Sequence, residues 1–167
     1  MIEFTLIHDF DLTPARFWQL FFDPGFTREM LLDGLGFGVC DIDPVIEAGG
    51  KRSRIMRVQP KLDLPAAVAK LLGPKLGYTE HGRQDVATGE WSYEISMSVL
   101  TERIRIGGRM TVEALGAERC RRTSHLWNEV RILGVGGLVE KAAERNMRDG
   151  WEKAATWMRG WIRQHPG

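Results

Sequence analysis

Three consecutive segments in the C-terminal half of the sequence, residues 90–100, 104–115 and 119–132, alternate apolar and polar residues. A period of two is typical of strands with one covered and one exposed face, so the pattern predicts an antiparallel sheet. The residues on its covered face are Trp91, Tyr93, Ile95, Met97, Val99, Ile104, Ile106, Met110, Val112, Ser124, Leu126, Asn128, Val130 and Ile132. Ser124 and Asn128 interrupt this face and need hydrogen-bond partners there, either from a ligand or from the main chain and buried water.

A long amphipathic segment follows these strands. Residues 134–164 span about 30 residues, which is roughly 45 Å as an α-helix. One side carries the series Val139, Ala143, Met147, Gly150, Ala154, Met158 and Trp161, and charged residues fill much of the remainder. This predicts a helix that packs one side on the sheet. The small residues in the middle of the series either let the sheet approach closely or leave a gap.

The N-terminal half predicts a strand, two short helices and further strands. Ile2–Phe10 alternates like a strand, and Thr13-Pro14 is typical of a helix start, so we expect a helix at Pro14–Phe22. Asp23-Pro24-Gly25 ends that helix and begins a second one through residues 30–35. Strands are expected at 37–47, 51–59 and 76–85, with an apolar helical piece at Ala66–Leu72. The fold class is α+β, with about seven strands in one domain spanning residues 1–167.

Composition and charge exclude several classes of protein. With 23 Lys and Arg against 22 Asp and Glu the net charge is +1, so we expect no nucleic-acid partner. No apolar stretch is long enough for an integral membrane segment, and the N-terminus lacks a basic signal-peptide region, so a cytoplasmic location is expected. Neither Cys40 nor Cys120 belongs to a CxxC pair, and the histidines lack metal-binding spacing, so no metal or cofactor is expected.

Three stretches of the sequence resemble one superfamily. They are FTLIHDFDLTPARFWQLFFDP at the start, the insertion LPAAVAKLLG, and VRILGVGGLVEKAAERNMRDGWEKAATWM at the end. Together with the element order, the first and last stretches resemble the START-like or Bet v 1-like (SRPBCC) superfamily. The insertion and the GLVEK corner of the last stretch resemble its bacterial DUF2505-type subgroup. The resemblance implies a helix-grip fold, in which a curved antiparallel sheet wraps the long C-terminal helix and leaves an apolar cavity. Members of the superfamily bind lipids, polyketides or aromatic compounds, and some are cyclases or dehydratases.

The predicted function is therefore binding or carriage of a small hydrophobic molecule between sheet and helix. The expected lining residues are Trp91, Tyr93, Met97, Met110, Leu126, Asn128, Met147 and Met158. Two alternatives stay open: a polyketide cyclase or dehydratase using the same cavity, and a noncatalytic protein-interaction module. The same eight residues also fit a solid core with no ligand. No catalytic motif is present, and the sequence leaves the ligand and the oligomeric state undetermined.

Several polar residues have two interpretations. His8 lies on the apolar side of its strand and is expected to be a hydrogen-bonded core residue rather than a base. Tyr78 and His81 are three residues apart, so they point to opposite faces of a regular strand. A dense set of arginines is expected on the outer sheet face, paired with glutamates there: Arg103, Arg105, Arg109, Arg119, Arg121 and Arg122. The 60–76 insertion either covers the mouth of a cavity or plugs one end of the sheet.

Overall fold

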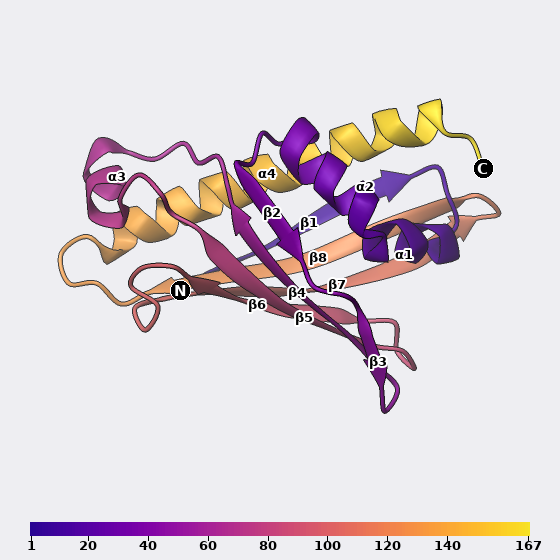
Figure 1. Ribbon diagram of the computed structural model, residues 1–167, viewed down its shortest axis with the longest axis horizontal. Helices are drawn as coiled ribbons and strands as arrows, with labels where there is room; N and C mark the ends of the chain where they lie inside the picture. Colours follow the sequence, from indigo (N-terminus) through magenta and orange to yellow (C-terminus); the bar gives the residue numbers. More distant parts are fainter.

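The computed structural model describes all 167 residues, in which an antiparallel sheet curves around a long C-terminal helix (Figure 1). The elements in chain order are β1 (Ile2–Phe10), α1 (Pro14–Phe22), α2 (Pro24–Glu29), the π-helical turn η1 (Met30–Gly34), β2 (Val39–Ile42), β3 (Ile46–Ala48), β4 (Lys51–Gln59), α3 (Ala66–Leu72), β5 (Tyr78–Asp85), β6 (Trp91–Met97), β7 (Ile104–Gly116), β8 (Arg119–Val130) and α4 (Gly136–Gln164). The strands pair antiparallel in the order β1-β8-β7-β6-β5-β4-β2, and β3 pairs with β4. The predicted helix-grip arrangement is confirmed.

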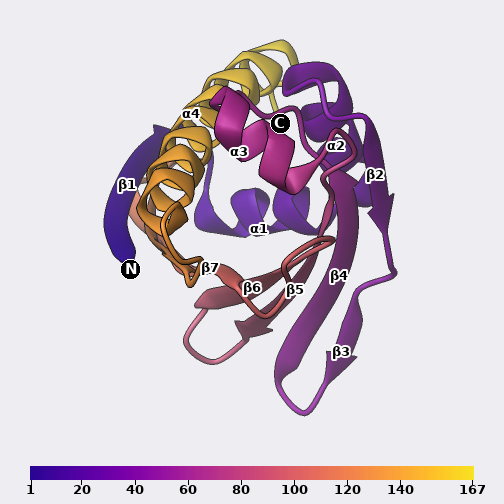
Figure 2. The same cartoon turned by 90° about the vertical axis from the view of Figure 1, so that its left-hand side faces the viewer.

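The end-on view in Figure 2 shows how the sheet wraps the helix. β1 lies beside α4 on one side, and the sheet curves away through β7, β6 and β5 to β4 and β2 on the other. α3 lies at the near end, close to the start of α4. The segment before α3 is tied to α4 because the Asn146 amide accepts from Asp63 N at 2.9 Å and donates to Asp63 O at 2.8 Å. The insertion therefore lies against α4 at one end of the sheet.

The strand predicted at 37–47 is wrong as a single element. It divides into β2 and β3, so the sheet has eight strands instead of about seven. Pro44 falls in the interruption, and a proline has no N–H with which to continue a ladder. Pairing with β4 resumes at Ile46, opposite Ser53. The division therefore follows from Pro44, which the alternation of apolar and polar residues does not take into account.

The helix ends follow local capping signals. Thr13 accepts a hydrogen bond from Arg16 N at 3.1 Å and Asp23 accepts one from Phe26 N at 2.8 Å, which satisfies free N–H groups at the starts of α1 and α2. α4 begins at Gly136, two residues later than predicted, after a turn in which Gly134 has a φ of 82°. No helix, α4 included, is both long enough and apolar enough to cross a lipid bilayer.

Two glycines leave positions without side chains in the middle of the inner face of the sheet. In the register across the sheet, Tyr93 lies between Gly82 and Gly108. A Cβ at Gly82 would overlap the indole of Trp91, and a Cβ at Gly108 would lie 3.0 Å from Tyr93 Cε1. The two aromatic rings therefore lie over positions that have no side chain. This arrangement lets large residues cover the sheet without standing upright from it.

The apolar core that holds α4 to the sheet consists of two separate clusters. The first joins β1, α1, α2, the sheet strands β6, β7 and β8, and the C-terminal half of α4. Its members are Phe4, Leu6, Phe10, Leu12, Phe17, Leu20, Phe26, Trp91, Tyr93, Met110, Cys120, Leu126, Ala155 and Met158. The second joins α3, the ends of β6, β7 and β8, and the first turns of α4, and its members are Val68, Leu72, Leu76, Met97, Ile104, Ile106, Val130, Val139 and Ala142. Apolar burial therefore anchors the helix near both ends.

Replacing Gly82 by alanine should destabilise the protein by about 1–3 kcal/mol, because the new methyl group must displace the Trp91 ring from a packed core. Urea denaturation followed by far-UV circular dichroism measures this free energy. Ser96→Ala, an exposed position on the neighbouring strand, is the control and should change stability by less than about 0.5 kcal/mol. Equal stabilities of the two variants would contradict the packing of Trp91 over Gly82.

Candidate functional site

The middle of α4 contacts the inner face of the sheet, for example through Glu152 at His8 and Trp151 at Arg122, without burying any of its own residues. On α4, every residue from 143 to 153 keeps some exposure, whereas Ala142 before them and Ala154 after them are buried. Opposite this stretch, Ile95 on the central strand β6 faces inward and is also only partly buried. A Cβ placed at Gly150 would meet no atom within 4 Å. We call this region, defined by Tyr78, Ile95, Met147 and Gly150, the central seam.

The structure brings the predicted lining residues to one interface but gives them different environments. Trp91, Tyr93, Met110, Leu126 and Met158 are buried members of the first cluster, and Met97 belongs to the second. Met147 is partly exposed and packs against both clusters. Most of the predicted residues therefore belong to the two clusters on either side of the central seam, and Met147 lies in the central seam itself.

Asn128 is a buried polar side chain without a partner. It is 0% exposed, and neither its Nδ2 nor its Oδ1 makes a hydrogen bond. Its neighbours across the sheet are Ile2 and Ile106. The hydroxyl of Ser124, which is also 0% exposed, has no partner either. Leaving a buried group unsatisfied costs about 1–3 kcal/mol, so both side chains favour a partner that the protein itself does not supply.

A charged group that the sequence did not indicate lies beside the central seam. Arg54 is 5% exposed and donates to Phe21 O at 2.6 Å and to Glu80 Oε1 at 3.3 Å. Its guanidinium also lies over the Phe21 and Trp91 rings, 4.4 and 5.2 Å from their centroids. The sequence contained a signal for this inward direction, because Arg54 occupies the same series of alternate positions along β4 as the apolar residues Met56 and Val58.

Tyr78 is the neutral polar group of the central seam. It is opposite Val58 and Met97 in the register, so it points inward, yet its side chain keeps accessible surface. Burial, with the nearby Glu80 charge, raises the pKa of its phenol well above 10. The hydroxyl is therefore protonated at physiological pH and can donate or accept a hydrogen bond. His81, on the same strand, is exposed on the outer face, as the spacing predicted.

His8 is a satisfied core residue, as expected. Its Nδ1 lies 2.9 Å from Arg122 Nη2 and its Nε2 lies 2.9 Å from Glu152 Oε1. Because a guanidinium can only donate, Nδ1 must accept and Nε2 must carry the proton that Glu152 accepts. Burial, followed by the charge of Arg122, lowers the pKa of His8. The arrangement requires a neutral imidazole, which leaves neither ring nitrogen free to act as a base.

Arg122 corrects the prediction that the arginine set shares the outer face. It is 4% exposed on the inner face, where its guanidinium lies 4.6 Å from the Trp151 ring centroid. Burial lowers its pKa to about 9, so it keeps its charge at neutral pH. The prediction grouped the arginines by their closeness in the sequence. It overlooked that Arg122 is two residues from Ser124 on the same strand, so both side chains point to the inner face. Of the others, Arg105 pairs with Glu129 across strands at 3.9 Å.

Two pockets of substantial volume lie outside the central seam. One, of about 780 Å³, is on the outer face of the sheet, with polar residues such as His81, Arg83 and Glu94 around it. The other, of about 540 Å³, is lined by four arginines and two aspartates where β1, β8 and α4 meet. No three His, Cys, Asp or Glu side chains are grouped so as to hold a metal ion.

Comparison with solved structures defines the class of fold. The chain is similar to a START superfamily protein from Mycobacterium smegmatis, with a TM-score of 0.64, 14% identity and 97% of each chain covered. It is also similar to the Zhui aromatase/cyclase from Streptomyces sp. R1128, with a TM-score of 0.63, 14% identity, and 99% of this chain and 97% of that chain covered. Norcoclaurine synthase from Thalictrum flavum, in complex with dopamine and hydroxybenzaldehyde, gives a TM-score of 0.61 at 15% identity, with 99% and 90% covered. The fold is START-like.

Within this class the sequence identifies the family. The family described as DUF2505, protein of unknown function, matches residues 5–162, and the chain belongs to it. No curated protein matches the sequence significantly. The expected resemblance, both to the superfamily and to this subgroup, is confirmed.

The His8 contacts predict a specific dependence of stability on pH. Because the folded protein holds the pKa of His8 below its unfolded value of 6.5, this contribution is complete above pH 6.5 and is lost as the pH falls below it. The free energy of unfolding should decrease between pH 7 and pH 5, and His8→Gln should reduce that decrease. Asp9, Asp43 and Asp85 titrate below 3.8, outside this window.

Chemical denaturation at each pH measures the slope. His125→Gln is the matched control, since His125 is exposed and contacts Thr5 Oγ1 at 2.9 Å on the outer face. It should keep the pH dependence of the unmodified protein. A slope that His8→Gln leaves unchanged would show that His8 is not held neutral.

Proposed function

We propose that the protein binds a small, mainly apolar molecule in the central seam, between the two clusters that anchor α4. The observation that carries the proposal is the run of α4 residues 143–153, none of which is buried although α4 is anchored on both sides of it. The facing residue Ile95 is likewise incompletely covered. A guest there would bury apolar surface that the protein alone leaves partly in contact with water, at about 25 cal/mol per Å².

The polar groups around the central seam suggest the chemistry of the guest. Tyr78 offers a neutral hydroxyl, and Asn128 offers an amide donor and acceptor that no protein group uses. A guest with an apolar body and one hydroxyl or carbonyl group would satisfy part of the Asn128 amide. Reaching it requires a side-chain rearrangement, because Asn128 is fully covered in the present structure. Met147, a flexible side chain in the central seam, is suited to such a change.

The similar solved structures are compatible with this proposal. Norcoclaurine synthase was crystallised with two aromatic molecules, and Zhui is an aromatase/cyclase. In the present chain neither His8 nor His81 offers a base to the central seam, because His8 is held between Arg122 and Glu152 and His81 lies on the outer face. We therefore propose binding, with the residues of the predicted lining forming the walls around the guest.

Filling the central seam should abolish binding. The neutral fluorescent probe N-phenyl-1-naphthylamine should bind the unmodified protein saturably, and Gly150→Phe should weaken its affinity at least about tenfold, because the new ring occupies the space of the guest. Gly137→Phe is the matched control: it lies on the same helix, and a Cβ there also meets nothing within 4 Å, but it is exposed to solvent.

Circular dichroism checks that both variants are folded. If Gly150→Phe does not fold, the smaller Gly150→Leu replaces it. Gly137→Phe should keep the affinity of the unmodified protein. The proposal fails if the probe does not bind saturably, or if the two phenylalanine variants bind it equally well.

Replacing Asn128 by leucine should separate stability from binding. Removing the unpaired amide should stabilise the ligand-free protein by about 1–3 kcal/mol, measured by urea denaturation. Asn146→Leu is the control and should destabilise, because the Asn146 amide bonds with Asp63 and Ala142. For binding, the unmodified protein should prefer 2-naphthol to naphthalene, and Asn128→Leu should lose that preference. An unchanged preference together with lower stability would assign Asn128 a structural role alone.

A further inference from the structure

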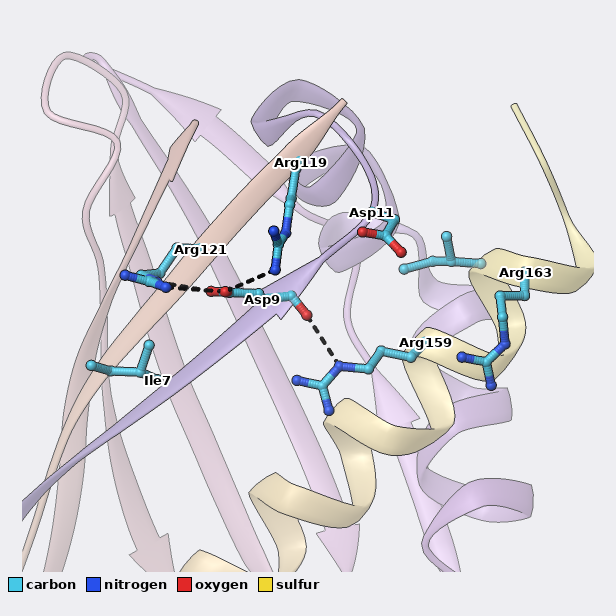
Figure 3. Close-up of a pocket in the computed structure, with 8 residues that line it drawn as sticks. Ile7, Asp9, Asp11, Arg119, Arg121, Arg159 and Arg163 are labelled. Carbon is cyan, nitrogen blue, oxygen red and sulfur yellow. Dashed lines mark hydrogen bonds and ion pairs between the residues drawn. The ribbon is translucent and has the colours of Figure 1, made fainter. Parts of the chain in front are cut away.

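The pocket of about 540 Å³ lies on the outside of the molecule, away from the central seam, and gathers arginines from two elements. β8 contributes Arg119 and Arg121, and α4 contributes Arg159 and Arg163. Figure 3 shows these side chains around Asp9 and Asp11, at the point where the end of β1 passes α4. Four guanidinium groups face two carboxylates, so the pocket carries a charge of +2 in a chain whose net charge is +1.

Asp9 neutralises only one side of this pocket. Its carboxylate accepts from Arg121 Nε at 2.8 Å and Nη2 at 3.0 Å, and from Arg119 Nη2 at 3.4 Å. The Arg121 hydrogen bond holds the pKa of the Asp9 carboxyl below its ordinary value, so it stays ionised. This fork-to-carboxylate pair is complete and has little capacity for a further anion.

The two arginines of α4 have no carboxylate partner. Arg159 donates from Nε to the main-chain oxygen of Asp9 at 3.1 Å and lies 5.5 Å from the Phe10 ring centroid, which fixes its guanidinium at the pocket. Arg163 makes no ion pair or hydrogen bond with any other residue. Residues four apart on a helix are neighbours, so two like charges stand side by side, which is unfavourable unless an anion lies between them.

Stabilisation of the helix end does not account for this arrangement. Positive side chains in the last turns of a helix interact favourably with its free carbonyl groups. Arg159, however, turns away from those carbonyls and bonds with Asp9 O on β1. The contact draws the guanidinium toward the arginines of β8 instead of the end of α4.

We propose that this pocket binds a phosphate monoester dianion, held between Arg159 and Arg163 with Arg119 at its edge. A guanidinium fork matches the geometry of two phosphate oxygens, and a dianion would balance the charge of +2. The pocket is larger than a phosphate group, and Ile7, which is 57% exposed, with Ile162 offers an apolar wall for the organic part of the ester. An ester free in solution and an ester in a lipid headgroup present the same chemistry to this pocket.

Isothermal titration at constant ionic strength in chloride buffer tests the proposal, with glycerol 1-phosphate as the soluble probe. Vesicles of phosphatidylcholine with and without phosphatidic acid form the second arm. The double variant Arg159→Gln/Arg163→Gln should weaken binding at least about tenfold in whichever arm shows it, because two charge-assisted contacts are lost. Asp11→Asn should strengthen binding about threefold, because it removes a negative charge from the pocket wall.

Arg28→Gln is the matched control, since Arg28 is exposed on α2 and has no partner in the structure. It should leave the affinity unchanged, which separates a built site from general attraction to a cation. Binding of the soluble probe identifies a soluble ester, and binding only of vesicles that contain phosphatidic acid identifies a headgroup. Absence of saturable binding in both arms, or equal losses in the Arg28 and Arg159/Arg163 variants, would overturn the proposal. Neither variant touches the central seam, so this result is independent of ligand binding there.

Discussion

The other elements of the structure are arranged around the packing of the long helix α4 against the curved sheet. α4 buries its own residues at two places, where Val139 and Ala142 join one cluster and Ala155 and Met158 join the other. Between these places every α4 residue keeps some exposure, although Trp151 and Glu152 still contact Arg122 and His8. The glycines at 82 and 108 leave positions without side chains on the inner face, and the rings of Trp91 and Tyr93 lie over them. The middle keeps this exposure although apolar residues, Ile95 and Met147, are present there.

The interior also contains charged and polar side chains. Arg54 and Arg122 are each buried, and each is held by a main-chain or side-chain partner and by aromatic rings. Asn128 and Ser124 differ because the protein supplies them with no partner. Each arginine also has one buried nitrogen, its Nε, without a partner, but at least one other nitrogen of each guanidinium is bonded. Because buried polar groups are normally satisfied, the proposed guest is expected to bond with Asn128 rather than with the arginines.

Much of the fold follows from the sequence, since the alternation in β6, β7 and β8 places Trp91 and Leu126 on the inner face, and Ala66–Leu72 forms the predicted helix. The division at Pro44 was missed because alternation continues on either side of it. Of the site, the inward direction of Asn128 was predictable from parity, whereas the role of Arg54 depends on Phe21, a residue of α1 far away in sequence. The openness at Gly150 depends on how α4 packs on the sheet, which no local pattern encodes.

The most direct measurement of the central claim is a crystal structure of the protein under xenon pressure, since xenon occupies apolar spaces without needing a specific ligand. We expect xenon to bind between the sheet and the middle of α4, in contact with Ile95 and Met147 and next to Gly150. Helix and sheet side chains in continuous contact through that region, with no xenon between them, would contradict it.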